Sequence, residues 1–187
     1  MIKDLKYKLL RSVFACMALV LFTQCDFIFK PENNKEQSFN AERVAVKKNE
    51  AKLLVDATQH NLDVRELIEV IKERDIDTHT EKIVNSIEKY QLNVFNQYEQ
   101  VAKEQVISIP NFSLVNKKQY LLDNRVPVEE VLTKITSKLQ KQIDSIQRLM
   151  DKSNNAEFIE MAKKVNEQLV MSLDKTDLLK EEISKQI

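Results

Sequence analysis

The feature that most constrains this chain of 187 residues is that it contains no glycine. Two-residue β-hairpin turns need positive φ angles, which glycine adopts without a steric penalty. A sheet protein of this size would usually need glycine in its tight turns. Lysine, glutamate, glutamine, leucine and isoleucine dominate the sequence instead. The composition therefore predicts an all-α fold.

The absence of glycine also excludes several classes of enzyme. Phosphate-binding loops, dinucleotide-binding fingerprints and the G-x-S-x-G nucleophile turn all require this residue. A nucleic-acid partner is not expected either, because 29 basic and 29 acidic residues balance and are interspersed, whereas nucleic-acid binding needs a concentrated basic face. Both cysteines, Cys16 and Cys25, lie in the N-terminal apolar segment, so the remaining chain has no thiol for a disulfide, a zinc site or a nucleophile.

From about residue 40 onward, apolar residues recur at helical spacing in four long segments. The helices are expected at about 41–74, at 78–105, from Pro127 onward and from Asn154 to the end, with a short extra helix ending near Leu122. Thr78, Ser113 and Asn154 are the predicted capping residues. The first two predicted stripes are Leu53, Ala57, His60, Val64, Leu67 and Ile71, and Ile83, Ile87, Tyr90, Val94, Tyr98 and Val101. The third is Leu132, Ile135, Leu139, Ile146 and Leu149, with Val131 and Ile143 beside it. The fourth is Phe158, Ala162, Val165, Leu169, Ser172, Thr176, Leu179 and Ile183.

Four amphipathic helices can bury their stripes together by packing around one core. We therefore expect an antiparallel four-helix bundle over residues 40–187, with the short extra helix between the second and third long helices. The connection through Pro110 is expected to cross the end of the bundle. A long coiled-coil dimer is the alternative fold, but Pro110, Pro127 and Asn154 interrupt the helical pattern.

The N-terminus has the layout of a secretory signal. Four basic residues precede the apolar run SVFACMALVLFTQ, which Thr23, Gln24 and Asp26 interrupt too early for a membrane-spanning helix. The sequence LFTQC resembles the bacterial lipobox, in which a signal peptidase cleaves before a lipid-modified cysteine. We expect a signal peptide at 1–24, lipidation at Cys25 and a tether over 25–39. An uncleaved signal anchor is the alternative.

Either alternative places the domain on the non-cytoplasmic side of a membrane. The expected partner is membrane lipid, through the acylated N-terminal Cys25, at the outer or inner membrane, with the domain in the periplasm or at the cell surface. An envelope protein is a second candidate partner. The sequence leaves open which membrane and leaflet are involved, and also the oligomeric state.

The helical region also resembles a ferritin-like family of bacterial exported proteins of unknown function, often labelled predicted outer-membrane proteins. The resemblance rests on LLVDATQHNL, on a helix ending in EQVAKEQVISIP, on SLVNKKQYLL and on the two last helices. Members typically carry a glutamate in the first helix, at Asp63 or Val64 here, and histidines in the later three, near Tyr90, Gln140 and Ser172. None of these histidines is present. We therefore expect a degenerate member with no metal site and no cofactor.

The remaining polar candidates have structural explanations. His60 lies on the first stripe and is expected to be a partly buried histidine near the bundle end, whereas His79 is expected to be exposed. Tyr90 and Tyr98 are expected in the core with their hydroxyls at its rim. Ser172 and Thr176 are expected to satisfy backbone groups or to specify register.

We therefore expect no catalytic residues. The predicted function is a non-catalytic binding or structural module of the envelope. A ferritin-like metal-binding or redox protein with atypical ligands is the alternative.

Overall fold

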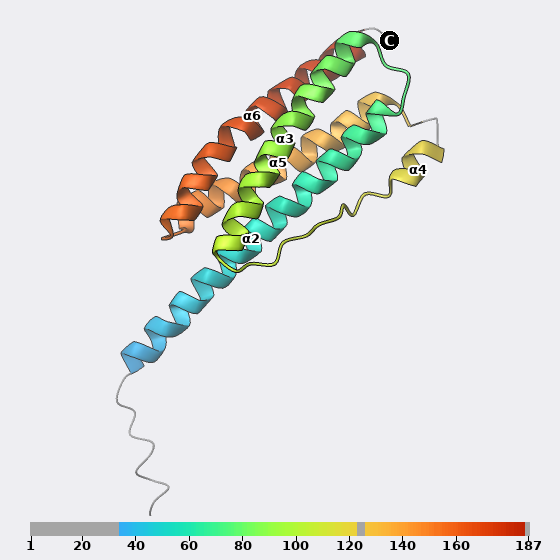
Figure 1. Cartoon of the computed structure of the whole chain (residues 1–187). Coiled ribbons are helices and arrows are strands. Elements are labelled where there is room, and N and C mark those ends of the chain that lie inside the picture. The colour runs from blue at the N-terminus through green and yellow to red at the C-terminus, as the bar shows by residue number, and fades with distance from the viewer. Residues whose placement is uncertain (1–33, 123–125, 186–187) are drawn as a thin grey trace, which may run out of the picture. The chain divides into compact units, whose positions relative to one another are not determined.

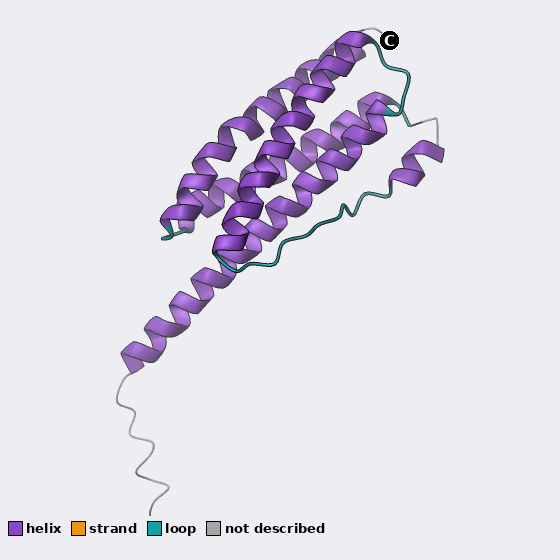
Figure 2. Cartoon of the chain, in the orientation of Figure 1, coloured by secondary structure: helices purple, strands orange, loops and turns teal. Residues whose placement is uncertain are grey.

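The structure, a computed structural model, describes residues 34–122 and 126–185, with side chains from Glu42 onward. The described residues form helices and loops without any strand, which confirms the predicted all-α class (Figure 2). Residues Ala45–Ile187 form one compact unit. The predicted signal segment 1–24, with Cys16, and the predicted lipidation site Cys25 lie outside the described residues.

The helices are α2 (Asn34–Lys72), α3 (Thr78–Glu104), α4 (Lys117–Leu122), α5 (Val128–Lys152) and α6 (Ala156–Ser184). Four are long, and α4 is the short extra helix predicted between the second and third. Helix α2 begins at Asn34, inside the segment predicted as a tether. No glycine or proline occurs between Pro31 and Lys72, so the sequence offers nothing to break the helix there.

The helix caps lie close to the predicted residues but not on them. Asp77, not Thr78, caps α3 and accepts hydrogen bonds from the backbone N–H groups of His79 and Thr80. Asn155, not Asn154, caps α6 by accepting from the N–H of Glu157. Pro127 stands one position before α5, as its N-cap. The prediction that Ser113 caps the short helix was wrong, because α4 begins only at Lys117.

Neighbouring long helices pack antiparallel (Figure 1). Helix α6 packs against both α3 and α5. Helix α2 is bonded to α3 through Asn61 and Gln91 and to α5 through Asp63 and Lys138. In this arrangement α3 and α5 lie diagonally opposite each other. The four helices bury their stripes within one chain, unlike the coiled-coil dimer considered as the alternative.

The connection from α3 to α5 runs along the side of α2, so the prediction that it crosses the bundle end was wrong (Figure 1). The backbone carbonyl of Phe112 accepts from Gln59, Lys117 pairs with Glu73, and Val126 accepts from Arg74. Since a helix rises 1.5 Å per residue, these contacts extend over about 20 Å, from Gln59 to the end of α2 and the turn that follows it. We call residues 105–127 the crossover.

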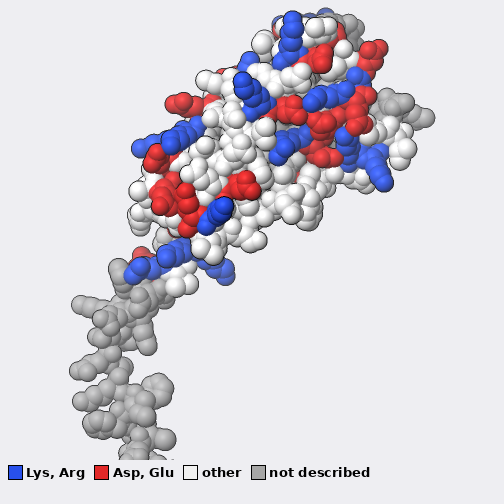
Figure 3. Space-filling model, in the orientation of Figure 1, with Lys and Arg blue, Asp and Glu red and all other residues white. Residues whose placement is uncertain are grey.

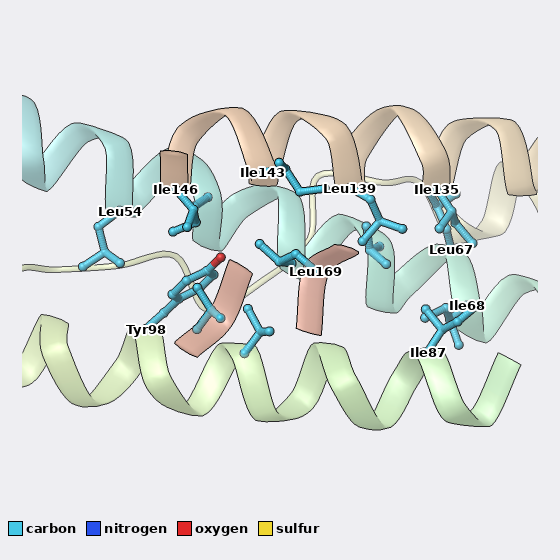
Figure 4. Close-up of a cluster of buried hydrophobic side chains, with 14 of the residues drawn as sticks. Leu54, Leu67, Ile68, Ile87, Tyr98, Ile135, Leu139, Ile143, Ile146 and Leu169 are labelled. Atoms are coloured by element: carbon cyan, nitrogen blue, oxygen red, sulfur yellow. The ribbon is translucent and has the colours of Figure 1, made fainter. Parts of the chain in front are cut away.

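The core lies between the four long helices (Figure 4). Nearly all the predicted apolar stripe positions are buried there. Tyr90 differs, because it is only half-buried while the adjacent Gln91 is completely buried. Tyr98 is buried as predicted, but its hydroxyl lies inside the core and not at the rim.

Candidate functional site

The centre of the bundle contains a set of polar side chains in place of apolar ones. Asn61 on α2, Gln91 on α3, Gln142 on α5 and Ser172 on α6 are each 0% exposed. We call these four residues the central polar layer. Each sits on its helix's apolar stripe, as Gln91 does between Ile87 and Val94, so the helical period turns all four toward the same interior.

Gln91 connects the layer. Its side-chain oxygen accepts hydrogen bonds from the amide nitrogens of Asn61, at 2.9 Å, and Gln142, at 3.0 Å. Its own amide nitrogen donates to the hydroxyl of Ser172 at 3.1 Å. Asn61 also donates to the backbone carbonyl of Gln91 at 2.9 Å. One glutamine therefore bonds to the three other long helices.

Hydroxyl groups around the layer are bonded to their own helices. Ser172 donates to the carbonyl of Gln168 at 2.8 Å, and Thr176 donates to the carbonyl of Ser172 at 2.7 Å. This confirms that Ser172 and Thr176 satisfy backbone groups. With its proton engaged in this way, the Ser172 hydroxyl has no neighbouring base to activate it as a nucleophile among the described residues.

A second polar cluster ties the crossover to the bundle. Asp63, whose side chain is 1% exposed, accepts hydrogen bonds from the Ser113 hydroxyl and the Leu114 N–H, both at 2.9 Å. It also accepts from Gln59 at 3.1 Å and pairs with Lys138 at 2.7 Å. We call these five residues the Asp63 clamp. They join α2, α5 and the crossover.

The clamp keeps Asp63 ionised. Burial alone would raise the pKa of this carboxyl, but the hydrogen bonds from Lys138, Leu114 and Ser113 outweigh burial and hold the pKa below its usual value. These three hydrogen bonds therefore stabilise the charged form. Such a carboxylate is a structural acceptor and is poorly suited to donate or receive protons near neutral pH.

His60 is half-buried in the middle of α2, not near the bundle end as predicted. Burial, followed by the positive charge of Lys138, lowers the pKa of His60 below 6.5. Its Nδ1 atom is buried and has no hydrogen-bond partner among the described residues. The ring is therefore neutral near pH 7, and no carboxylate of the described chain accepts from Nδ1 to orient it as in a catalytic pair. His79 is exposed as predicted, with its ring 3.1 Å from a Glu182 oxygen.

The positions suggested by the family resemblance do not converge on one point. Asp63 is held by the crossover, whereas Val64 lies in the core. Tyr90 is half-buried, and Gln140 is exposed and bonded to Asp144. Only Ser172 belongs to the central polar layer.

The central polar layer does not fit a carboxylate-bridged metal pair. Such a site in a helical bundle needs several glutamate and histidine side chains facing one another. The layer consists of three neutral amides and a hydroxyl, which are bonded to one another. Elsewhere in the part of the chain that the structure describes, no group of three or more histidine, cysteine, aspartate or glutamate side chains is placed to hold a metal ion.

A groove of about 480 Å³ lies between α2, α3 and the crossover. Its lining mixes apolar and charged side chains, which are Leu62, Arg65, Glu66, Glu69, Glu88 and crossover residues including Phe112. Lys72 pairs with Glu69 and Glu88 beside it. Both signs of charge are interspersed over the visible face of the molecule (Figure 3). The charged lining of the groove itself is three glutamates and one arginine, and two of those glutamates are paired with Lys72.

Sequence analysis identified Ser172 as a polar stripe position but missed Asn61, Gln91 and Gln142. Each of the three is a polar residue at the spacing of a buried stripe, as Gln142 is between Leu139 and Ile146, and this spacing could have identified them.

No helix among the described residues has the length and apolar character needed to cross a membrane. No protein family, curated protein or solved structure matches this chain.

Proposed function

We propose that this chain is a lipoprotein of the bacterial cell envelope, anchored to the outer or inner membrane through an acylated Cys25. The helical domain would then stand in the periplasm or at the cell surface. It acts as a binding or structural module and does not catalyse a reaction.

The non-catalytic part of this proposal rests on one observation, which is that the buried polar groups form hydrogen bonds with one another. In the central polar layer, Gln91 bonds to Asn61, Gln142 and Ser172. In the clamp, Asp63 accepts four hydrogen bonds. A catalytic centre needs a base within reach of a nucleophile or of a substrate proton. These groups are instead bonded to one another and hold helices together.

The membrane anchor is supported by the N-terminal sequence. A basic start, an apolar run and Cys25 occur in the order that lipid modification requires. Each buried CH₂ group contributes about 0.8 kcal/mol to membrane binding, so several acyl chains on one cysteine give a stable anchor.

We also propose that the bundle is a ferritin-like fold. Four long helices and a single crossover between the second and third support this, because ferritin-like bundles have one such long connection. The short helix α4 is part of that connection and contacts α5, where Lys134 donates to the Tyr120 hydroxyl at 2.9 Å. On this proposal the ferritin-like fold is kept without its usual metal ligands.

Intact-mass analysis of the protein extracted from membranes tests the anchor. The expected species begins at Cys25 and carries a diacylglyceryl group, with or without an additional N-linked acyl chain. Cys25→Ser should abolish both the cleavage and the added mass, whereas Cys16→Ser should be processed like the wild type. A mass that corresponds to the unmodified chain from Met1 would contradict the proposal and favour the uncleaved anchor.

A further inference from the structure

The central polar layer contains a backbone group that fixes how its amides point. The backbone carbonyl of Gln91 can only accept a hydrogen bond, and the Asn61 side chain lies 2.9 Å from it. The nitrogen of Asn61 must therefore face Gln91. Because that nitrogen is also 2.9 Å from the Gln91 side chain, the atom it meets there must be the oxygen. Gln142, at 3.0 Å from the same oxygen, must likewise present its nitrogen.

This orientation leaves acceptors without donors. The side-chain oxygens of Asn61 and Gln142 are buried and have no hydrogen-bond partner among the described residues. An unsatisfied buried acceptor destabilises the folded state, because it has lost its hydrogen bonds to water without gaining others. Buried polar groups in folded proteins therefore nearly always find a partner, either protein or water.

The same orientation leaves donors without acceptors. Each side-chain amide has two N–H hydrogens. Asn61 uses both of its hydrogens, but the amide nitrogens of Gln91 and Gln142 each donate one hydrogen bond, to Ser172 and to Gln91. The layer therefore has unmet acceptors and spare donors on amides that are joined through Gln91.

We propose that the central polar layer binds at least one internal water molecule, held by Asn61 and Gln142. Water both donates and accepts, so it can satisfy a carbonyl oxygen and a spare N–H together. A cation would satisfy the two oxygens, but the spare N–H groups would repel it. An anion would accept from the spare N–H groups, but the two oxygens would repel it. The layer is neutral, which matches a neutral guest.

The water completes a hydrogen-bonded layer that reaches all four long helices. Gln91 already bonds to the three other helices. A water between Asn61 and Gln142 adds a direct link between α2 and α5 at the same level. A slip of any helix by one turn would break these bonds and leave buried amides unpaired, so the hydrated layer specifies the register of the bundle.

Nuclear magnetic resonance of the full-length chain tests this proposal. Cross-relaxation between internal water and the side-chain amide protons of Gln142 is expected in the wild type. Relaxation dispersion of the water signal should count at least one water that stays bound longer than the protein takes to tumble. Absence of both signals would overturn the proposal.

Two variants locate the water. Gln142→Leu should lower the number of long-lived waters by at least one, while Gln140→Leu, on the exposed face of the same helix, should keep the wild-type number. An unchanged number in a folded Gln142→Leu would overturn the assignment, and if this variant does not fold, the wild-type spectra decide. Sodium, magnesium and zinc chlorides should leave the layer's amide signals unshifted, whereas a saturable shift with one of them would show that the guest is a cation.

Discussion

Val106 has a backbone conformation that its side chain disfavours, and replacing it with glycine should stabilise the protein. Its φ angle is 57°, in the left-handed region. The N–H of Ile107 donates to the carbonyl of Ala102 at 2.7 Å, and the N–H of Val106 donates to the carbonyl of Lys103 at 3.3 Å. These two bonds form the Schellman motif that ends many helices, usually with glycine at the left-handed position. This chain has no glycine, and valine occupies that position instead.

The change in the free energy of unfolding expected for Val106→Gly is the difference between two opposing contributions. The left-handed conformation costs an L-residue roughly 1–2 kcal/mol, and a β-branched side chain suffers most. Glycine makes the unfolded chain more flexible, which costs about 0.4–1 kcal/mol. The Val106 side chain is 92% exposed, so removing it loses almost no packing. Val106→Gly should therefore raise the free energy of unfolding by about 0.5–1 kcal/mol, and each kcal/mol raises Tm by about 2–4 °C.

Urea unfolding followed by far-ultraviolet circular dichroism measures this change. Val106→Asn should also stabilise the protein, because asparagine tolerates the left-handed region. Val106→Ala keeps a Cβ atom and should change stability less than glycine does. Val170→Gly, inside α6, is the opposite control and should destabilise by about 0.5–1 kcal/mol or more. A Val106→Gly variant no more stable than the wild type would refute the assignment of strain to this residue.

Three further predictions concern buried polar groups. Asp63→Ala should lower the free energy of unfolding by about 2–3 kcal/mol and speed hydrogen exchange in the crossover, because hydrogen bonds to a charged group are lost; Asp56→Ala, at an exposed pair, should cost under about 1 kcal/mol, and equal effects would contradict the clamp. Tyr98→Phe should leave stability unchanged or raise it by about 1 kcal/mol, since the buried hydroxyl has no partner among the described residues; a clear loss in urea unfolding would show a missing partner. Because the pKa of His60 is lowered, unfolding favours protonation, so stability should fall as pH drops below about 6.5. In a pH series of urea unfolding, His60→Gln should flatten this slope; an unchanged slope in His60→Gln would show that burial of this ring is not its cause.

Helix positions and most of the core followed from local spacing, but the central polar layer did not. On α3, either Tyr90 or Gln91 can stand between Ile87 and Val94 in an alternation of three and four residues. Sequence analysis chose the aromatic residue, yet the structure buries the amide. The choice depends on partners 30 and 81 residues away, Asn61 and Ser172. Local periodicity does not contain that information.

The caps and the crossover illustrate two other limits. Asp77 and Thr78 are adjacent good capping residues, as are Asn154 and Asn155, so spacing alone leaves an error of one position. The path of the crossover depends on Asp63 meeting Ser113 and Leu114, about fifty residues further along the chain. A buried aspartate on a helix has no sequence signal that identifies such a distant partner.

The central claim is that the interior of the bundle contains amides bonded to one another and no reactive metal centre. Elemental analysis tests it most directly, on the full-length chain purified after exposure to iron, manganese and zinc and then washed with a chelator. We predict far less than one metal ion per chain. One or more tightly held ions per chain would contradict the claim.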